Sequence, residues 1–181
     1  ACEDGAFYGN GSLAIVELNS CVTFANGCFD SCVLLTDFSA AAAVTIGETC
    51  LANCNTLAAV NIPLAESIGE SCFFICLTLT SIVANNATSI GDTCFYNCIS
   101  LTNISLLSCV SLGSSTADNG VFSGITGKTI AFACPPALLT CDGGDPDGDI
   151  VYLQANNTVT INDEAGFAWD NFFAVSLHDT P

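Results

Sequence analysis

The sequence predicts an α/β solenoid, a right-handed coil of short strands and short helical turns that ends in a β-rich C-terminal cap. Two stretches, IGESCFFICLTLTSI and IGDTCFYNCISLTNI, follow each other at an offset of 22 residues. Half of the 181 residues are hydrophobic, which is enough for a sizeable core. A unit of about 20 residues cannot bury its own apolar side, so successive units must stack and share one core.

Apolar residues recur at this period as four columns. One column holds mainly isoleucine, one only leucine, one β-branched or aromatic residues, and one mainly phenylalanine. The register holds over five successive units without an insertion, a regularity that is hard to obtain by chance. The columns are Phe24, Ile46, Ile68, Ile90 and Leu112; Leu13, Leu35, Leu57, Leu79 and Leu101; Val16, Phe38, Val60, Ile82 and Ile104; and Phe7, Phe29, Leu51, Phe73 and Phe95.

Each unit is expected to run from strand to turn to short helix. The segment LTNISL at 101–106 ends in period-2 alternation, which is typical of a short strand. An Ile-Gly step marks a turn with a second short strand or bend. In DTCFYNC, Cys94 and Cys98 stand four apart, which places them on one face of a helical turn, and Asp92 or Thr93 is suited to cap that turn.

Thirteen cysteines are the most unusual feature of the composition, and eight of them form two columns at the same period. They could be buried thiols that fill the core, or a disulfide ladder within a coil or between adjacent coils. A metal array is less favoured, because zinc sites prefer shorter C-x-x-C spacings with histidine help and His178 is distant. The two columns are Cys28, Cys50, Cys72 and Cys94, and Cys32, Cys54, Cys76 and Cys98.

The unit I-G-x-x-C-F-x-x-C-x-x-L-x-x-I, found between about residues 2 and 112, resembles the BspA-type leucine-rich repeats of bacterial and protozoan surface proteins. The consensus of that family has Ala-Phe where this chain has Cys-Phe, as at Cys72 and Cys94. The repeated exchange of alanine for cysteine beside an existing cysteine favours disulfides over filler. The resemblance implies a curved extracellular solenoid used for adhesion or protein binding, with no catalytic residues to carry over.

The charge balance excludes several classes of function. Eighteen acidic residues face one lysine, Lys128, and no arginine, for a formal charge of −17. Such a chain cannot neutralise nucleic acid phosphates, and an anionic membrane repels it. One histidine and no recognisable nucleophile–base pair argue against an enzyme. Cysteine usage indicates export, so we expect an extracellular or cell-surface location, and no apolar run is long enough for membrane insertion.

The pattern changes after Leu112 and predicts three regions: a repeat solenoid at 1–112, a degenerate repeat and β-rich cap at 113–162, and an aromatic C-terminal tail at 163–181. VFSGI resembles a last coil, with Phe122 where the repeat phenylalanine would stand. The segments KTIAFAC, VYL and TVTI are expected to be cap strands. Such a cap would cover the open end of the solenoid.

Four carboxylates in the segment CDGGDPDGD suggest calcium, and an exposed acidic turn is the alternative. The EF-hand pattern is not met, because Asn156 stands where a bidentate glutamate is needed. No cofactor is therefore required, and calcium is the one candidate. The four residues are Asp142, Asp145, Asp147 and Asp149.

The two ends of the chain suggest self-association. Aromatic residues crowd the tail, and no amphipathic cap precedes the first coil, so we expect Cys2 and Phe7 to be exposed there. Two non-enzymatic functions follow: adhesion through recognition of a protein or glycan ligand, or a fibre in which copies of the chain stack head to tail. The candidate residues for self-association are Cys2, Phe7, Phe167, Trp169, Phe172 and Phe173.

Overall fold

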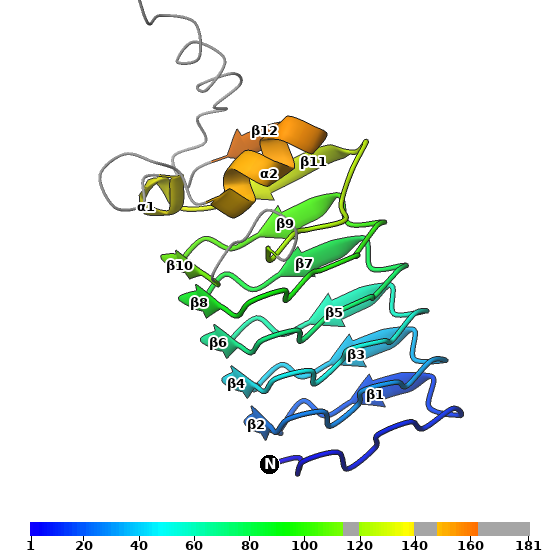
Figure 1. Cartoon of the computed structure of the whole chain (residues 1–181). Coiled ribbons are helices and arrows are strands. Elements are labelled where there is room, and N and C mark those ends of the chain that lie inside the picture. The colour runs from blue at the N-terminus through cyan, green and yellow to red at the C-terminus, as the bar shows by residue number, and fades with distance from the viewer. Residues whose placement is uncertain (114–119, 140–147, 163–181) are drawn as a thin grey trace, which may run out of the picture.

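The computed structural model, which describes residues 1–113, 120–139 and 148–162, is a parallel β-solenoid with two sheets side by side (Figure 1). A seven-stranded sheet contains β1 (Ile15–Glu17), β3 (Asp37–Ser39), β5 (Ala59–Asn61), β7 (Ser81–Val83), β9 (Asn103–Ser105), β11 (Thr129–Ala133) and β12 (Thr158–Asn162). A five-stranded sheet contains β2 (Thr23–Phe24), β4 (Thr45–Ile46), β6 (Ser67–Ile68), β8 (Ser89–Ile90) and β10 (Ser111–Leu112). The two helices, α1 (Pro136–Leu139) and α2 (Gly148–Asn156), belong to the last part of the chain.

The predicted period of 22 residues is confirmed by the strand register. Ile46 pairs with Ile68, and Ile68 pairs with Ile90, in parallel strands of the shorter sheet. The phenylalanine column is buried, and its rings stack from coil to coil, with centroids 5.4 Å apart for Phe73 and Phe95. The predicted columns are therefore one continuous core.

The short helical turn expected in each coil is wrong. Thr49, Ser71, Thr93 and their neighbours four residues on have positive φ, as Ile75 does at 58°, which a right-handed helix does not allow. Alternate backbone N–H groups cross to the next coil, as from Phe73 to the Cys94 carbonyl at 2.9 Å, while those between them close tight turns. The segment is therefore a string of turns laddered between coils, and Thr93 forms part of it rather than a helix cap.

The glycine of each Ile-Gly step is required by the stacking of coils. A Cβ on Gly69 would lie 2.6 Å from the backbone of Glu48, and Gly47 meets the previous coil in the same way. Real Cβ atoms do not approach that closely, so the coils could not stack at this distance with any other residue. The step is therefore a point of close approach between coils.

The predicted degenerate coil is confirmed. The ring of Phe122 stacks on Phe95 at 5.7 Å, and the Phe95 N–H donates to the Val121 carbonyl at 2.9 Å, as its equivalents do in the regular coils. Phe122 stands 27 residues after Phe95 instead of 22, so this coil is five residues longer than the others.

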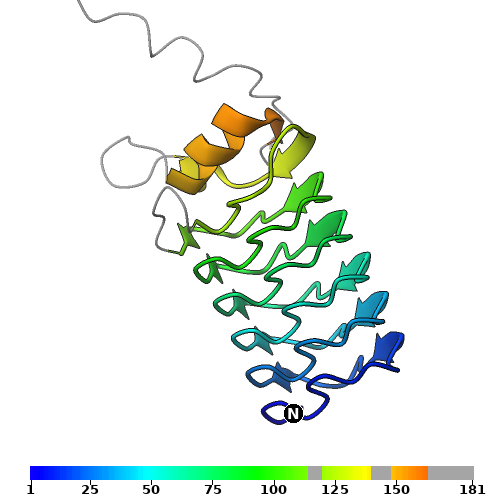
Figure 2. The ribbon, with the colours of Figure 1, turned by 45° about the vertical axis from the view of Figure 1, so that its right-hand side comes forward.

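The cap combines strands with helices. Two of the three expected strands are confirmed as β11 and β12, which extend the seven-stranded sheet. The expected strand VYL is wrong, because it lies inside α2, where Ile150 and Leu153 are buried three residues apart at helical spacing. Figure 2 shows α2 lying across the end of the solenoid.

Candidate functional site

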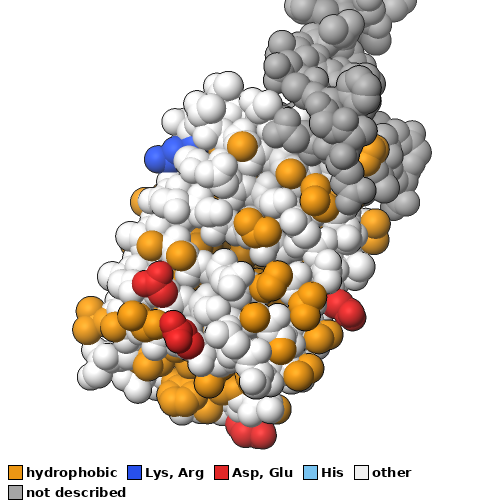
Figure 3. Space-filling model, turned by 180° about the vertical axis from the view of Figure 1, so that it is seen from behind, with side chains coloured by type: hydrophobic (Ala, Val, Ile, Leu, Met, Phe, Trp, Pro, Cys, Tyr) orange, Lys and Arg blue, Asp and Glu red, His pale blue; other side chains and the backbone are white. Residues whose placement is uncertain are grey.

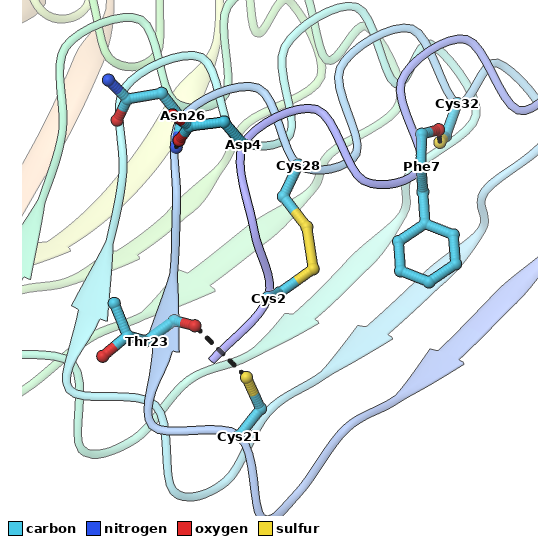
Figure 4. The surroundings of a disulfide bond; sticks show 8 residues. All are labelled: Cys2, Asp4, Phe7, Cys21, Thr23, Asn26, Cys28 and Cys32. Carbon is cyan, nitrogen blue, oxygen red and sulfur yellow. Dashed lines mark hydrogen bonds between the residues drawn. A yellow bond between two sulfur atoms is a disulfide. The ribbon is translucent and has the colours of Figure 1, made fainter.

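The structure contains one disulfide, between Cys2 and Cys28, which fastens the first coil to the second (Figure 4). The Cys2 side chain is 8% exposed, so the expectation that it is exposed at the first coil is wrong. Cys21 lies beside this bond, because its Sγ donates to the Thr23 carbonyl at 3.3 Å and the Cys2 N–H donates to the same oxygen at 2.8 Å. Sequence reasoning missed this pairing, although Cys2 occupies the inward-facing isoleucine column.

The second cysteine column forms a ladder of hydrogen bonds between coils. The Sγ of Cys54 donates to the carbonyl of Phe29 at 3.3 Å, and the Sγ of Cys76 donates to that of Leu51 at 3.2 Å. Cys32 and Cys98 make the same bond, at 3.2 and 3.1 Å. A thiol is thus a small core residue that also supplies a donor, which alanine cannot do.

All seven column cysteines other than Cys28 carry free, buried thiols in the structure. Burial raises the pKa of the Cys50, Cys54 and Cys98 thiols to about 12. Buried thiols of this kind stay protonated near neutral pH and are poor nucleophiles and poor metal ligands. A disulfide ladder among Cys32, Cys50, Cys54, Cys72, Cys76, Cys94 and Cys98 stays a prediction.

No cluster of three or more histidine, cysteine or acidic side chains in the described part of the chain could hold a metal ion. Of the four calcium candidates, Asp142, Asp145 and Asp147 lie outside the described residues. Asp149 is 1% exposed at the start of α2, against Gly120 of the last coil, so it does not lie on an exposed acidic turn. Calcium binding therefore stays a prediction.

The first coil presents aromatic side chains at one end of the solenoid. Phe7 is 39% exposed and stacks on Phe29 with a centroid distance of 5.0 Å, and Tyr8 is 66% exposed. No other described ring covers the second face of Phe7. The other self-association candidates, Phe167, Trp169, Phe172 and Phe173, lie outside the described residues.

Charge is distributed unevenly between the two sides of the coils. The turn side carries a carboxylate column at the position before each left-handed turn residue, namely Asp4, Glu48, Glu70 and Asp92, with Asn26 in the same column. On the outer sheet faces, acidic side chains are few, and hydrophobic ones gather over the first coils (Figure 3). Only Glu17 and Asp37 project from the seven-stranded sheet, both from its first two strands.

The rest of that sheet presents a surface without ionisable groups, which we call the neutral shelf. It consists of the outward residues of β5, β7, β9 and β11, two from each strand, all exposed or half-buried. In-register pairing holds the strands at the regular spacing of a parallel sheet, about 4.8 Å. Its residues are Ala59, Asn61, Ser81, Val83, Asn103, Ser105, Ala131 and Ala133.

The solenoid geometry agrees with a comparison against protein families. A model of the BspA type leucine rich repeat region matches six copies in this chain, over residues 1–80 and 45–133. The chain belongs to this family. BspA-type repeats therefore account for the Ile-Gly step and the shared core, and their family is generally non-catalytic and consistent with protein recognition.

One solved structure of a BspA-type relative in fold is the Leucine Rich Repeat protein of T. pallidum. The two chains share 22% sequence identity with a TM-score of 0.53, and the match covers 65% of this chain. The match covers 53% of the T. pallidum chain, so the present chain spans about half of that length. Among curated proteins, no relative matches the sequence. Neither helix of the described residues is long and apolar enough to cross a bilayer.

Proposed function

We propose that this protein is a non-enzymatic extracellular recognition module that acts in adhesion and binds its partner on the neutral shelf. The observation that carries the proposal is the uneven charge: 18 carboxylates in the chain, and none on the shelf. Charged groups are depleted at the centre of protein interfaces, and the outer face of a rigid sheet holds its side chains in fixed positions. The disulfide supports an extracellular location.

Adhesion of coated beads to immobilised extracellular proteins and polysaccharides tests this proposal. We expect retention on at least one surface and its loss in a chain carrying Val83→Glu and Ala131→Glu, which place charges on the shelf. Glu48→Gln and Glu70→Gln on the turn side are the matched controls and should leave retention unchanged. Equal retention by the shelf variant and the wild type would refute the proposal.

A fibre of stacked copies is a second candidate, supported by the uncovered face of Phe7. In this arrangement, the first coil of one copy docks on the far end of another, a contact that does not close and therefore propagates. Light scattering over a concentration series tests it. We expect particles larger than one chain that shrink in Phe7→Asp, whereas strictly monomeric protein at high concentration would end this candidate.

A further inference from the structure

The neutral shelf contains polar groups that the fold does not use. Among the described residues, the Ser81 hydroxyl and the Asn103 amide have no hydrogen-bond partner, and the two residues are register neighbours on β7 and β9. Other polar side chains nearby are engaged, since Ser105 donates to Asn85 at 2.6 Å and Asn61 to Ser39 at 3.3 Å. Ser81 and Asn103 thus offer donors and acceptors toward solvent at adjacent positions.

The relief around these two groups is low. Ala59 pairs with Ser81, and Ala131 pairs with Asn103, so the column reads alanine, serine, asparagine, alanine along four neighbouring strands. Side chains this short form a floor on which a flat ligand can lie and still reach the amide and hydroxyl. Val83, which is 45% exposed, adds an apolar contact at the edge of the floor.

The charge distribution selects the class of ligand. An anionic polymer meets a chain of net charge −17 and finds no cation on the shelf. A cationic partner finds its counter-charges on the turn side, in the column containing Glu48 and Glu70, and not on the shelf. A polymer of uncharged sugars fits the shelf, because its hydroxyls both donate and accept hydrogen bonds and its ring C–H groups pack on alanine and valine.

We propose that the ligand of the shelf is a neutral polysaccharide, held by Asn103 and Ser81 over a floor of small residues. This inference rests on the proposed recognition function and names the class of its partner. The strand spacing of about 4.8 Å presents equivalent positions at regular steps, so several sugar units along one chain can contact the shelf at once.

Sedimentation with insoluble polysaccharides tests the inference. The chain is made in a host that attaches no N-linked glycans, because Asn103-Ile104-Ser105 is itself an acceptor sequence. We expect retention on at least one of microcrystalline cellulose, chitin and insoluble starch, and none on heparin or alginate beads. Retention should change less than about twofold between low and high salt, because no ion pair contributes.

The variants Asn103→Leu and Ser81→Ala should each weaken retention about tenfold, the effect of losing one good hydrogen bond. Thr45→Val and Ser89→Ala are matched controls on the outer face of the five-stranded sheet and should bind like the wild type. The inference fails if none of the three neutral polysaccharides retains the chain. It also fails if retention is confined to cationic chitosan and lost in salt, or if the shelf variants bind normally.

These outcomes separate the inference from the function on which it rests. If the shelf variants lose adhesion to an immobilised protein while no neutral polysaccharide retains the chain, the recognition function stands and the ligand class is wrong. If charges on the shelf change no binding of any kind, both fall.

Discussion

The turn side and the outer sheet faces of this solenoid follow different rules, although the same coils build both. On the turn side, each position repeats one residue type: glycine at the close approach, cysteine in two columns, and small or polar residues at positive φ. On the outer face of the seven-stranded sheet, one column reads Ile15, Asp37, Ala59, Ser81 and Asn103, with no shared property.

The difference teaches which positions the fold constrains. Turn-side residues contact the coil above and the coil below, so a change at one of them is felt twice. Outward sheet residues contact mainly solvent, so the fold leaves them open to selection for binding. We therefore expect substitutions on the turn side to change stability, and substitutions on the shelf to change binding.

Alkaline unfolding gives the largest expected effect, because it acts on every buried thiol at once. An unfolded thiol ionises near pH 9, whereas the buried thiols of Cys50, Cys54 and Cys98 hold their protons to about pH 12. The unfolded state then binds fewer protons, so stability is complete below pH 9 and falls as the pH rises toward 12. Each thiol contributes about 1.4 kcal/mol per pH unit in that window.

Thermal melts followed by circular dichroism between pH 7 and 11 check this expectation. The variant Cys54→Ala should show a shallower decline than the wild type. Intact mass after alkylation of the denatured chain counts the thiols, and with and without reductant it also detects a disulfide ladder. A pH-independent melting temperature in a chain that carries the seven thiols would contradict the prediction.

The next effect comes from the close approach of coils at Gly69. Gly69→Ala places a Cβ 2.6 Å from the previous coil and should lower the free energy of unfolding by about 3 kcal/mol, because rigid backbone must move. Gly11→Ala is the control, since nothing lies within 4 Å of a Cβ there. Chemical denaturation measures both, and equal stability of the two variants would show that the coils can separate freely.

Removal of the disulfide should cost somewhat less. Cys2→Ser opens a bond that joins residues 26 apart in sequence, and we expect a loss of about 2 to 3 kcal/mol. Hydrogen exchange should locate the loosened backbone in the first coil, from Gly5 to Gly9. Cys21→Ser, which leaves the bond intact, is the control. A uniform rise in exchange through the later coils would place the effect elsewhere.

A gain in stability is expected at Ile75, a β-branched residue with φ of 58°. Its equivalents are Asn53 and Asn97, and asparagine tolerates this conformation far better. Ile75→Asn should raise the free energy of unfolding by up to about 1 kcal/mol, measured by denaturation. Val33→Asn, at an exposed position without positive φ, should give no gain.

The smallest effects on stability are expected on the shelf. Asn103→Leu and Ser81→Ala remove no contact of the folded chain and should change the free energy of unfolding by less than about 0.5 kcal/mol. The same two variants are the ones expected to lose binding. Melting temperatures within error of the wild type, combined with altered binding, would sharpen the division between the two sides; large destabilisation would break it.

The period carried most of the fold in the sequence. Because Ile46, Ile68 and Ile90 recur without insertion, their alignment follows from counting, and Phe122 extended the count into a longer coil. The turn segment could not be read in the same way. Cys94 and Cys98 at a spacing of four fit a helix equally well, and Thr93 resembles a helix cap unless its positive φ is known.

The candidate site was less accessible to sequence reasoning than the fold. Columns were searched for shared residues, so a surface defined by an absence of charge across unlike residues, such as Ser81 beside Asn103, gave no signal. The Cys2–Cys28 bond was missed because the two residues belong to different columns, and only the three-dimensional path of the first coil brings them together. The strand expected at VYL failed because the spacing of Ile150 and Leu153 is helical.

The hydrogen bonds that link each coil to the next have a consequence for how such a chain can grow. Every internal coil offers its successor the same set of donors and acceptors that it received from its predecessor. A duplicated 22-residue segment could therefore be spliced between any two coils without altering the joints on either side. Each such copy would lengthen the rod by one layer, so gene duplication can change the reach of the molecule in fixed increments.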